Sequence, residues 1–476
     1  MSAEDKVKFK SDFDLIVLGA GSAGFSAAIT ASKAGKTVAL VGHGLIGGTC
    51  VNVGCVPSKA LIRAADSMHA EAISQRFAGI EVATRLTSYR ANAEQRDSLV
   101  DMLRAEKYIG LLPEYENVTY FDAVEPAVLG DRQVFFNNKT LRAPKVVIAT
   151  GTRPQVPELD GLDVTPFLNS TTLLARKDLP KSLIFIGGGY IAVELAQAMR
   201  RMGAKVTILA RSGLLSRVEP EISKALTEVL TAEGIDVIVG AAKRVESTAD
   251  GNVTVTYDAH GKEGYATSSD IVITTGRTAN TERLGLDIIG VATGRNGSVL
   301  VDDHLRTNLE WLYGAGDVIG ENEFVYMAAL EGKIAATNAL GDEDISVHGT
   351  VVPWVVFCEP QIAGVGISEA QAIEAGHEVV TSILPMSKVP RAIAGRDTRG
   401  LVKLVADKET CRLLGGQIIA PEGGDVIQTL TVLIQAGSTY KDLAETVFPY
   451  LTSVESLKLA GQGFTQDIAK LSCCAG

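Results

Sequence analysis

No histidine occurs after His377 in this chain of 476 residues, although six histidines are present overall. The sequence also lacks any run of about 18 apolar residues, so we expect no transmembrane helix and no stable membrane insertion. Positive charge is in the minority, because 45 lysines and arginines stand against 56 acidic residues, which gives a net charge of −11. Nucleic acids bind to basic surfaces, and we therefore expect no nucleic-acid partner.

What is present indicates a folded chain of several domains. Hydrophobic residues make up 46% of the sequence, which is ample for a sizeable core, and the length predicts about two to four domains. The N-terminal residues are charged and precede no apolar segment, so we expect no secretory signal and a cytoplasmic location. Structural disulfides are rare in that reducing compartment, and the close pairs Cys50/Cys55 and Cys473/Cys474 therefore favour redox or metal chemistry.

Two strand–glycine–helix units stand about 170 residues apart. An apolar run at 14–18 precedes Gly19-Ala-Gly21-Ser-Ala-Gly24, and another at 182–186 precedes Gly187-Gly-Gly189-Tyr-Ile-Ala192. Each unit continues into a second β-like run, at 37–41 and 205–209 respectively. Glycines at these points permit a tight turn and the close approach of a pyrophosphate to a helix N-terminus. Two such units predict two dinucleotide-binding sites, whereas one alone could be a packing turn.

Further apolar runs extend this organisation. Two of them end in Thr-Gly, at Thr150-Gly151 and at Thr275-Gly276, and read as strands that close each nucleotide domain. A third ends at Gly316-Asp317. After residue 350 the chain has no further nucleotide-type turn, and its strand at 401–405 and helix near 425–436 predict a third domain of α+β type.

Cys50 and Cys55 directly follow the first of these units. In an ideal helix, five residues span about 7.5 Å along the axis, which exceeds the reach of an unstrained disulfide. Gly54 and Pro57 predict a distorted helix start that brings the two sulfur atoms together. A helix N-terminus also favours the thiolate form of a cysteine. The alternative interpretation is that both are ordinary buried cysteines.

The string from Gly47 to Lys59, Gly-Gly-Thr-Cys-Val-Asn-Val-Gly-Cys-Val-Pro-Ser-Lys, resembles the active site of the flavin disulfide reductases. This class I pyridine nucleotide-disulfide oxidoreductase family includes glutathione reductase, lipoamide dehydrogenase and the mercuric reductases, and the resemblance covers essentially the whole chain. It implies that Cys55 touches the flavin and that Cys50 faces the substrate. It also implies that Lys59 lies near flavin N5, in an ion pair with Glu194. The residues alone, without the resemblance, leave the alternative that Lys59 and Glu194 are solvated charges on helices.

The resemblance implies an α/β fold with two Rossmann-like dinucleotide-binding domains and a C-terminal α+β dimerisation domain. The expected FAD-binding domain is discontinuous, at 1–155 and 278–348, with the NADPH-binding domain at 156–277 and the dimerisation domain at 349–476. The implied cofactors are FAD and NADPH. The residues implied to bind them are Gly19, Gly21, Ala23, Gly24, Gly44, Gly48, Thr49, Lys59, Ala123, Thr150, Gly151, Asp317, Val325, Gly187, Gly189, Arg211, Arg217 and Gly276.

Two positions in these sites concern cofactor recognition. Gly42 stands at the end of the second strand of the first unit, where the family usually carries an acidic residue for the FAD ribose. We therefore expect FAD to be bound by the other segments and less tightly. In the second unit, Arg211 and Arg217 occupy the region where an NAD site would carry a carboxylate, so NADPH is the expected nucleotide. The alternative is that both arginines are surface charges.

The C-terminal region indicates the substrate. In glutathione reductase and lipoamide dehydrogenase a histidine five residues before a glutamate serves in acid–base chemistry; here Tyr450 precedes Glu455 in that way, and no later histidine exists. An unperturbed tyrosine has a pKa of about 10, which suits proton transfer at neutral pH poorly. Organic disulfides are thus disfavoured as substrates. Cys473 and Cys474 could share a soft metal ion or be incidental thiols in a tail.

Tyr450 and the terminal cysteine pair together resemble the mercuric reductases. That resemblance implies NADPH-dependent reduction of Hg(II) to Hg(0), a homodimer with shared active sites, and capture of small thiol-bound Hg(II) by Cys473 and Cys474. The ion would pass to Cys50 and Cys55 of the partner subunit, flanked by Tyr190 and Tyr450. For Tyr190 the alternative is a gate at the nicotinamide, since related reductases carry an aromatic residue there too. Two alternatives remain open: a disulfide reductase of the same fold, and a non-catalytic flavoprotein that sequesters metal.

Overall fold

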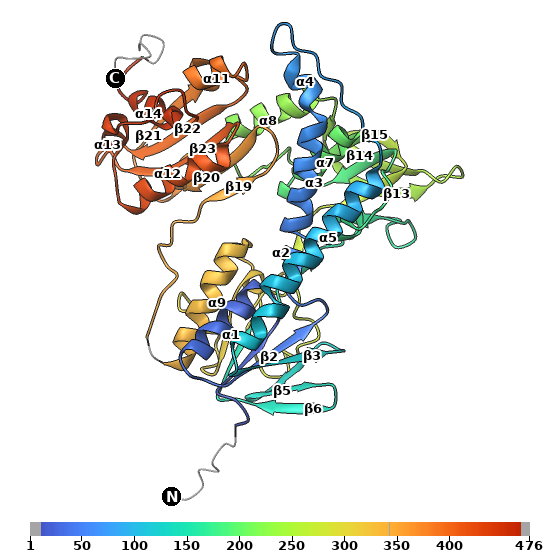
Figure 1. The fold of residues 1–476 in the computed structure, drawn as a ribbon, viewed down its shortest axis with the longest axis vertical. Coiled ribbons are helices and arrows are strands. Elements are labelled where there is room, and N and C mark those ends of the chain that lie inside the picture. Colours follow the sequence, from blue (N-terminus) through green and yellow to red (C-terminus); the bar gives the residue numbers. More distant parts are fainter. Residues whose placement is uncertain (1–10, 342, 468–476) are drawn as a thin grey trace, which may run out of the picture. The chain divides into compact units, whose positions relative to one another are not determined.

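The computed structural model describes residues 11–341 and 343–467 (Figure 1). The chain divides into two compact units. Unit 1 comprises Met1–Pro57, Glu94–Gln155 and Gly276–Thr350. Unit 2 comprises Ser58–Ala93, Val156–Thr275 and Val351–Gly476. The predicted α/β fold class is confirmed by the elements within each unit.

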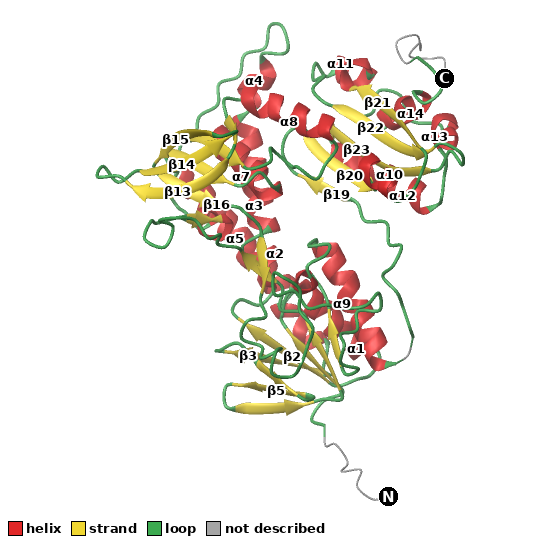
Figure 2. Ribbon diagram, turned by 180° about the vertical axis from the view of Figure 1, so that it is seen from behind, coloured by secondary structure: helices red, strands yellow, loops and turns green. Residues whose placement is uncertain are grey.

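Unit 1 contains a five-stranded parallel sheet in the order β18-β7-β1-β2-β3. All four residues of its central strand β1 are buried, as their unbroken apolar run predicts. Helices α1 and α9 lie side by side against this sheet (Figure 2). The main elements of unit 1 are β1 (Leu15–Leu18), α1 (Ser22–Lys33), β2 (Val38–His43), α2 (Gly48–Asn52), η1 (Ile109–Glu114), β3 (Val118–Ala123), β4 (Val128–Gly130), β5 (Gln133–Phe136), β6 (Lys139–Arg142), β7 (Lys145–Ile148), β8 (Thr152–Pro154), β17 (Arg277–Ala279), β18 (Leu312–Gly314), η2 (Asp317–Ile319) and α9 (Val325–Leu340).

Unit 2 contains a second five-stranded parallel sheet, β12-β11-β10-β16-β9, beside a three-stranded antiparallel sheet, β13-β14-β15. The strand of the second fingerprint, β10, pairs with β11 and β16 just as β1 pairs with β2 and β7 in unit 1. The elements are α4 (Ala70–Ser74), β9 (Leu168–Asn169), α6 (Ser170–Leu174), β10 (Ser182–Ile186), α7 (Tyr190–Met202), β11 (Lys205–Ala210), α8 (Pro220–Ala232), β12 (Asp236–Val239), β13 (Ala241–Ser247), β14 (Val253–Ala259), β15 (Lys262–Ser268) and β16 (Asp270–Ile273). Two helices, α3 (Cys55–Met68) and α5 (Tyr89–Lys107), begin in one unit and end in the other.

The C-terminal part of unit 2 is an antiparallel sheet, β19-β20-β23-β22-β21, with α12 packed on β20 and β23. Its strand β22 and helix α12 confirm the elements expected near 401–405 and 425–436. The elements are β19 (Trp354–Val356), β20 (Gln361–Gly366), α10 (Glu369–Glu374), β21 (Val379–Pro385), η3 (Met386–Lys388), α11 (Pro390–Ala394), β22 (Leu401–Asp407), β23 (Leu413–Ala420), α12 (Gly423–Gln435), α13 (Tyr440–Glu445) and α14 (Glu455–Gln462).

One buried lysine joins the two parts of unit 2. Lys403 on β22 is only 2% exposed, and its ammonium group lies 2.9 Å from Glu219 and 3.0 Å from Glu221, which flank the start of α8. A third carboxylate, that of Glu369, lies 2.7 Å away. A buried charge is tolerated only when it is paired and hydrogen-bonded, so this cluster ties α8 to the C-terminal sheet.

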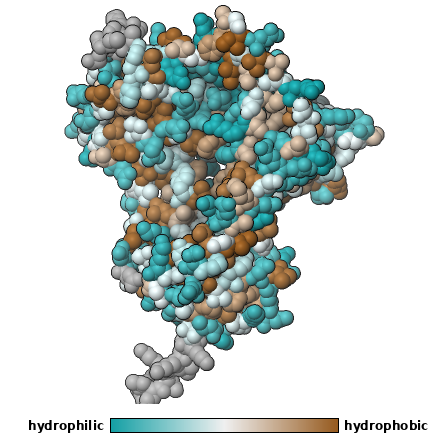
Figure 3. Space-filling model, viewed as in Figure 1, coloured by the Kyte–Doolittle hydropathy of each residue, from teal (hydrophilic) through white to brown (hydrophobic). Residues whose placement is uncertain are grey.

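On the face shown in Figure 3, hydrophobic residues are interspersed among hydrophilic ones. Within residues 11–341 and 343–467, every helix is too short or too polar to span a bilayer.

Candidate active site

The two cysteines of the first motif lie on separate helices. Cys50 is in α2, which ends at Asn52, and Cys55 is the first residue of α3. Val53 leaves the helical conformation with φ −140°, so the helix is interrupted between the cysteines, as Gly54 and Pro57 predict. A Cβ atom at Gly54 would lie 3.4 Å from Cys50 Cα and 3.0 Å from Thr49 O. The chain thus folds back tightly onto Cys50 just before Cys55.

Asn52 fixes this reversal, and the sequence alone did not single it out. Its side-chain amide donates to the carbonyl oxygens of Ile46 and Gly48, at 2.9 and 2.8 Å. Its amide oxygen accepts a hydrogen bond of 3.0 Å from Arg104, on α5. The Asn52 side chain therefore ties the end of α2 to its own start and to α5.

Tyr108 is a second residue that sequence reasoning missed. Its ring packs edge-on against Phe25, with 4.9 Å between centroids. The same ring lies next to Gly47 (φ +96°), where a Cβ atom would lie 3.1 Å from Tyr108 Cδ2. Burial raises the pKa of Tyr108, a hydrogen bond with Ser22 opposes the rise, and electrostatic interaction with Cys50 and Cys55 raises the pKa further. The Tyr108 hydroxyl therefore lies within electrostatic reach of both cysteines.

Lys59 and Glu194 are brought together as an ion pair of 2.8 Å. Lys59 follows Cys55 by four residues on α3, which places both on one face of that helix. Glu194 on α7 is 6% exposed, and its other carboxylate oxygen accepts a 2.9 Å hydrogen bond from the backbone N–H of Phe357. The Lys59 ammonium also lies 4.7 Å from the centroid of the Phe357 ring, a cation–π distance. Phe357 was not anticipated.

The first glycine fingerprint forms a turn that only glycine can build. Gly19 has φ +112°, and a Cβ atom there would lie 2.1 Å from Ala149 O. A Cβ atom at Gly24 would lie 1.8 Å from Gly19 O, so this glycine is needed for close helix–strand packing. Gly21 is the N-cap of α1. A Cβ atom at Gly48 would lie 2.8 Å from the Cα atom of Gly21. The fingerprint and the start of α2 therefore adjoin, as a single bound dinucleotide requires.

Other residues expected to bind cofactor gather at the ends of β7 and β18. The Thr150 hydroxyl is buried and has no hydrogen-bond partner among the described residues. Asp317 begins η2 and accepts a 3.2 Å hydrogen bond from Thr152, whose hydroxyl also accepts one of 2.6 Å from Arg277. An orphaned buried hydroxyl beside Gly151 (φ +66°) and a carboxylate at the sheet edge suit the polar groups of FAD.

The remaining expected residues of the first site are distributed along the same edge. Ala23 lies in α1, where it packs so tightly against α9 that a Cβ atom at Gly332 would lie 2.1 Å from its carbonyl oxygen. Gly44 follows β2 with φ +80° and has open space around it, and Thr49 is in α2. Ala123 ends β3 and Val325 begins α9.

The second fingerprint repeats the construction of the first. Gly187 has φ +124°, and a Cβ atom there would lie 2.3 Å from Thr274 O. Gly189 caps α7 and has open space beside it, which leaves the helix N-terminus accessible to a pyrophosphate. Arg211 directly follows β11, and both it and Arg217 are exposed. Gly276 has φ +135° and precedes β17.

Tyr190 is the first residue of α7 and stacks on Trp354, with 5.7 Å between ring centroids. Burial raises its pKa to about 12, although the charge of Arg217 opposes the shift. The hydroxyl therefore stays protonated throughout the physiological range.

Tyr450 lies on the loop before α14 and is 55% exposed. Next to it, the backbone N–H of Leu451 donates a 2.6 Å hydrogen bond to the buried Glu455. The glutamate thus fixes the loop that presents Tyr450. Cys473 and Cys474 lie outside the described residues.

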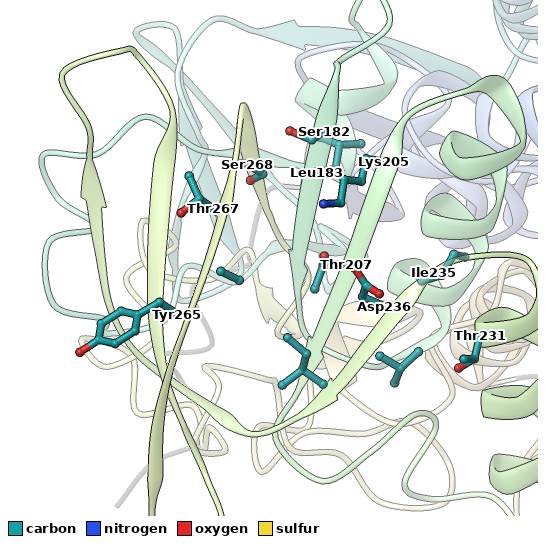
Figure 4. Close-up of a pocket in the computed structure, with 13 residues that line it drawn as sticks. Ser182, Leu183, Lys205, Thr207, Thr231, Ile235, Asp236, Tyr265, Thr267 and Ser268 are labelled. Atoms are coloured by element: carbon teal, nitrogen blue, oxygen red, sulfur yellow. The ribbon is translucent and has the colours of Figure 1, made fainter.

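A cavity of about 580 Å³ in unit 2 is separate from these features. Figure 4 shows Ser182, Lys205 and Asp236 around it, and these residues begin β10, β11 and β12. The fingerprint glycines follow the opposite, carboxyl end of β10, where nucleotides bind in such sheets. The cavity is therefore not the expected nucleotide site.

Comparison with known proteins defines the class of this chain. Residues 13–332 match the family described as pyridine nucleotide-disulphide oxidoreductase, and residues 352–460 match its dimerisation domain. The chain belongs to this family and is an NADPH-dependent flavoprotein oxidoreductase with FAD as its flavin. Its C-terminal segment is accordingly the domain through which family members form homodimers.

Within the family, the chain is similar to mercuric reductases. It is 41% identical to the mercuric reductase of Staphylococcus aureus over 100% of this chain and 87% of the relative. It is 42% identical to that of Streptomyces lividans, over 98% of both chains. A solved structure, the Cu(II) complex of the HOCl-induced flavoprotein disulfide reductase RclA from Escherichia coli, superposes with a TM-score of 0.83 at 29% identity, over 95% of this chain and 99% of the other. The resemblance to mercuric reductases inferred from the sequence is confirmed.

Proposed function

We propose that this chain reduces Hg(II) to elemental mercury with electrons from NADPH, and so serves in mercury detoxification. The observation that carries the proposal is the identity of 41% and 42% to mercuric reductases over almost the whole chain. The balanced reaction is NADPH + Hg(II) → NADP⁺ + H⁺ + Hg(0). The hydride of NADPH supplies both electrons, and the ion accepts both.

The residues of unit 1 are proposed to hold FAD and the metal ion. When bound, FAD supplies the redox group that accepts hydride from NADPH and passes two electrons onward. Cys50 and Cys55 would bind Hg(II) as thiolates, because soft sulfur ligands suit a soft ion. The reversal at Gly54 supports this role, since it folds the chain between the two cysteines back onto Cys50.

The residues of unit 2 are proposed to bind and orient NADPH. Arg211 and Arg217 would pair with the 2′-phosphate, and Gly187 and Gly189 would admit the pyrophosphate. Lys59, held by Glu194, would place a positive charge beside the flavin. A charge at that position would tune the electronics of the bound flavin.

The tail cysteines are proposed to act between the two subunits of a homodimer. Cys473 and Cys474 would take Hg(II) from small thiol complexes by ligand exchange and pass it to Cys50 and Cys55 of the partner. Exchange between thiolate pairs avoids release of free Hg(II). Tyr190 and Tyr450 would flank the ion during this transfer.

The first test is NADPH oxidation with and without Hg(II), together with detection of volatile elemental mercury. We expect Hg(II)-dependent turnover that is lost in Cys50→Ser and Cys55→Ser. The matched control is Cys411→Ser, which removes a half-buried thiol from β22–β23 and should keep full turnover. Turnover no higher than the oxygen-dependent background would refute the proposal.

The second test concerns the tail. Replacing Cys473 and Cys474 by Ala should lower turnover on Hg(II) bound to a bulky thiol, and should affect small Hg(II) complexes less. Equal turnover on the bulky complex would remove the capture role while leaving the reductase activity intact. Mixed dimers that combine a tail variant with a Cys50→Ser subunit would show whether the tail serves its partner.

Two other outcomes of the first test would select other functions. Faster turnover with oxidised glutathione or lipoamide would identify a disulfide reductase, the activity named for the superposed RclA structure. Tyr450 in place of histidine speaks against that outcome. Stoichiometric Hg(II) binding without elemental mercury would identify a sequestering flavoprotein.

A further inference from the structure

The carboxyl end of β2 departs from the usual design of a dinucleotide site. An acidic residue at the end of this strand commonly hydrogen-bonds the ribose hydroxyls of the adenosine moiety. In this chain the position is Gly42, the fifth residue of β2, and it offers no side chain. The adenosine ribose of FAD must therefore find its hydrogen-bond partner elsewhere.

Tyr120 occupies the space in which that carboxylate would begin. A Cβ atom at Gly42 would lie 2.6 Å from the Tyr120 hydroxyl oxygen and 2.9 Å from Cε2 of its ring. It would also lie 3.0 Å from the Cβ atom of Ala20, which belongs to the fingerprint turn. Gly42 is thus required by the neighbouring tyrosine, and the tyrosine hydroxyl adjoins the turn that approaches the dinucleotide.

The strand register explains how Tyr120 reaches this place. On β3, Tyr120 is the partner of Leu40, whereas Gly42 is the partner of Asp122. The ring therefore extends by two residues toward the carboxyl edge of the sheet, where ligands bind in such folds. It is half-buried against the core of unit 1, which fixes its direction.

We propose that the Tyr120 hydroxyl replaces the missing carboxylate and hydrogen-bonds the adenosine ribose of FAD. A phenol is both a donor and an acceptor, so it can satisfy one ribose hydroxyl. The hydroxyl also keeps its proton at neutral pH, because burial and the nearby Asp122 raise the pKa of Tyr120. This inference concerns how FAD is held, and it stands whichever substrate the enzyme reduces.

The direct test compares FAD affinity in wild type and Tyr120→Phe, by titrating the flavin-free protein with FAD and following flavin fluorescence. Phenylalanine keeps the ring and its packing, so only the hydroxyl is lost. We expect the dissociation constant to rise about three- to tenfold, the effect of one hydrogen bond between neutral groups. Tyr257→Phe, which removes a hydroxyl from β14 in unit 2, is the matched control and should change nothing. An unchanged affinity in Tyr120→Phe overturns the proposal.

A modified cofactor identifies the group that Tyr120 contacts. An FAD analogue without the 2′- and 3′-hydroxyls of the adenosine ribose should bind wild type more weakly than FAD does. Tyr120→Phe should bind FAD and the analogue equally well, because the partner hydroxyl is already absent. The same loss in both proteins would mean that Tyr120 does not contact the ribose.

Restoring the usual carboxylate tests the steric argument. The single variant Gly42→Glu should bind FAD more weakly than wild type, because the Tyr120 side chain occupies the space that the new Cβ atom needs. The double variant Gly42→Glu with Tyr120→Ala should bind FAD about tenfold more tightly than Tyr120→Ala alone, as a charge-assisted hydrogen bond predicts. Tighter binding by Gly42→Glu alone would overturn the proposal.

Asp122 is the alternative partner of the ribose. A loss of FAD affinity in Asp122→Asn that exceeds the loss in Tyr120→Phe would also overturn the proposal, since Asp122 would then be the ribose partner.

Discussion

The Lys59 ammonium group and the Glu194 carboxylate lie 2.8 Å apart, although 135 residues separate them in the chain. Glu194 is almost fully buried and uses its second oxygen to accept a hydrogen bond from Phe357 N–H. We predict that Glu194→Leu lowers the free energy of unfolding by about 1–3 kcal/mol, because two donors lose their acceptor. Thermal melting followed by circular dichroism measures this. Glu228→Leu, which breaks the exposed Lys224–Glu228 pair, is the control and should melt as wild type does.

Phe357 should position Lys59 through its ring. The 4.7 Å distance between the ammonium and the ring centroid predicts an attraction of about 0.5–1 kcal/mol at this half-exposed site. Phe357→Leu should therefore reduce the turnover number about two- to fivefold, while Phe357→Trp should retain it, because tryptophan is the better cation–π partner. The flavin absorption spectrum of each variant reports whether the charge has moved. Equal losses in the Leu and Trp variants would indicate a packing role only.

Asn52 should be the residue that holds the cysteine-bearing reversal. Asn52→Asp keeps the oxygen that accepts a hydrogen bond from Arg104. It replaces the NH₂ group, which donates to the carbonyl oxygens of Ile46 and Gly48, by a second oxygen that cannot donate. Acceptors that face each other repel, so we predict slower Hg(II)-dependent turnover, at least about tenfold, and a lower melting temperature. Asn137→Asp, at a loop of unit 1 far along the chain, serves as control. Undiminished turnover in Asn52→Asp would show that the chain reversal between Cys50 and Cys55 forms without the Asn52 hydrogen bonds.

The sequence predicted the parts of this fold that depend on local pattern. The apolar runs at 14–18 and 182–186 became β1 and β10 within one residue, because a buried parallel strand followed by glycines has a distinctive pattern. The interrupted helix between Cys50 and Cys55 followed from Gly54 and Pro57 in the same way. These features are determined within about ten residues of chain.

The parts of the site that the sequence did not reveal depend on distant contacts. Arg104 reaches Asn52 across 52 residues, and Phe357 reaches Glu194 across 163. An asparagine at the end of a short helix, or a phenylalanine in a loop, carries no local pattern that identifies its partner, and one sequence holds no information on pairing. The sequence pointed to Tyr120 only indirectly. Gly42 indicated that the usual ribose-binding carboxylate was missing, but identifying the strand that provides its replacement required the register of β2 and β3.

Arg211 and Arg217 should determine the preference for NADPH over NADH. Both guanidinium groups are exposed near the carboxyl end of β11, where a 2′-phosphate is expected. The double variant with Ala at both positions should raise the KM for NADPH about tenfold or more and leave the KM for NADH unchanged, because only NADPH carries the phosphate. Arg295→Ala, an exposed arginine of unit 1, controls for the lost charge. A rise in both KM values would assign the arginines to the shared part of the nucleotide.

Glu331 should make the stability of the protein depend on pH. It is 2% exposed and accepts a 2.8 Å hydrogen bond from Gly316 N–H, and burial raises its pKa to about 7 from 4.5 despite that bond. Between these two values the folded protein holds a proton that the unfolded chain releases, so stability falls as pH rises from 4.5 to about 7. The glutamate's stabilising contribution is complete below pH 4.5 and lost above about 7.

Glu331→Gln tests this dependence, because glutamine imitates the protonated carboxyl and does not titrate. We predict that the melting temperature of the variant exceeds that of wild type at pH 8 and that the difference shrinks toward pH 5, where the two proteins carry the same charge at this position. Melting temperatures of the holoenzyme at four pH values measure it. Glu282→Gln, whose carboxylate pairs with Arg153 at the surface, should show no such trend. A constant difference between wild type and Glu331→Gln from pH 5 to 8 would mean that Glu331 is ionised in the folded protein, and Gly316 N–H would then be bonded to a buried carboxylate.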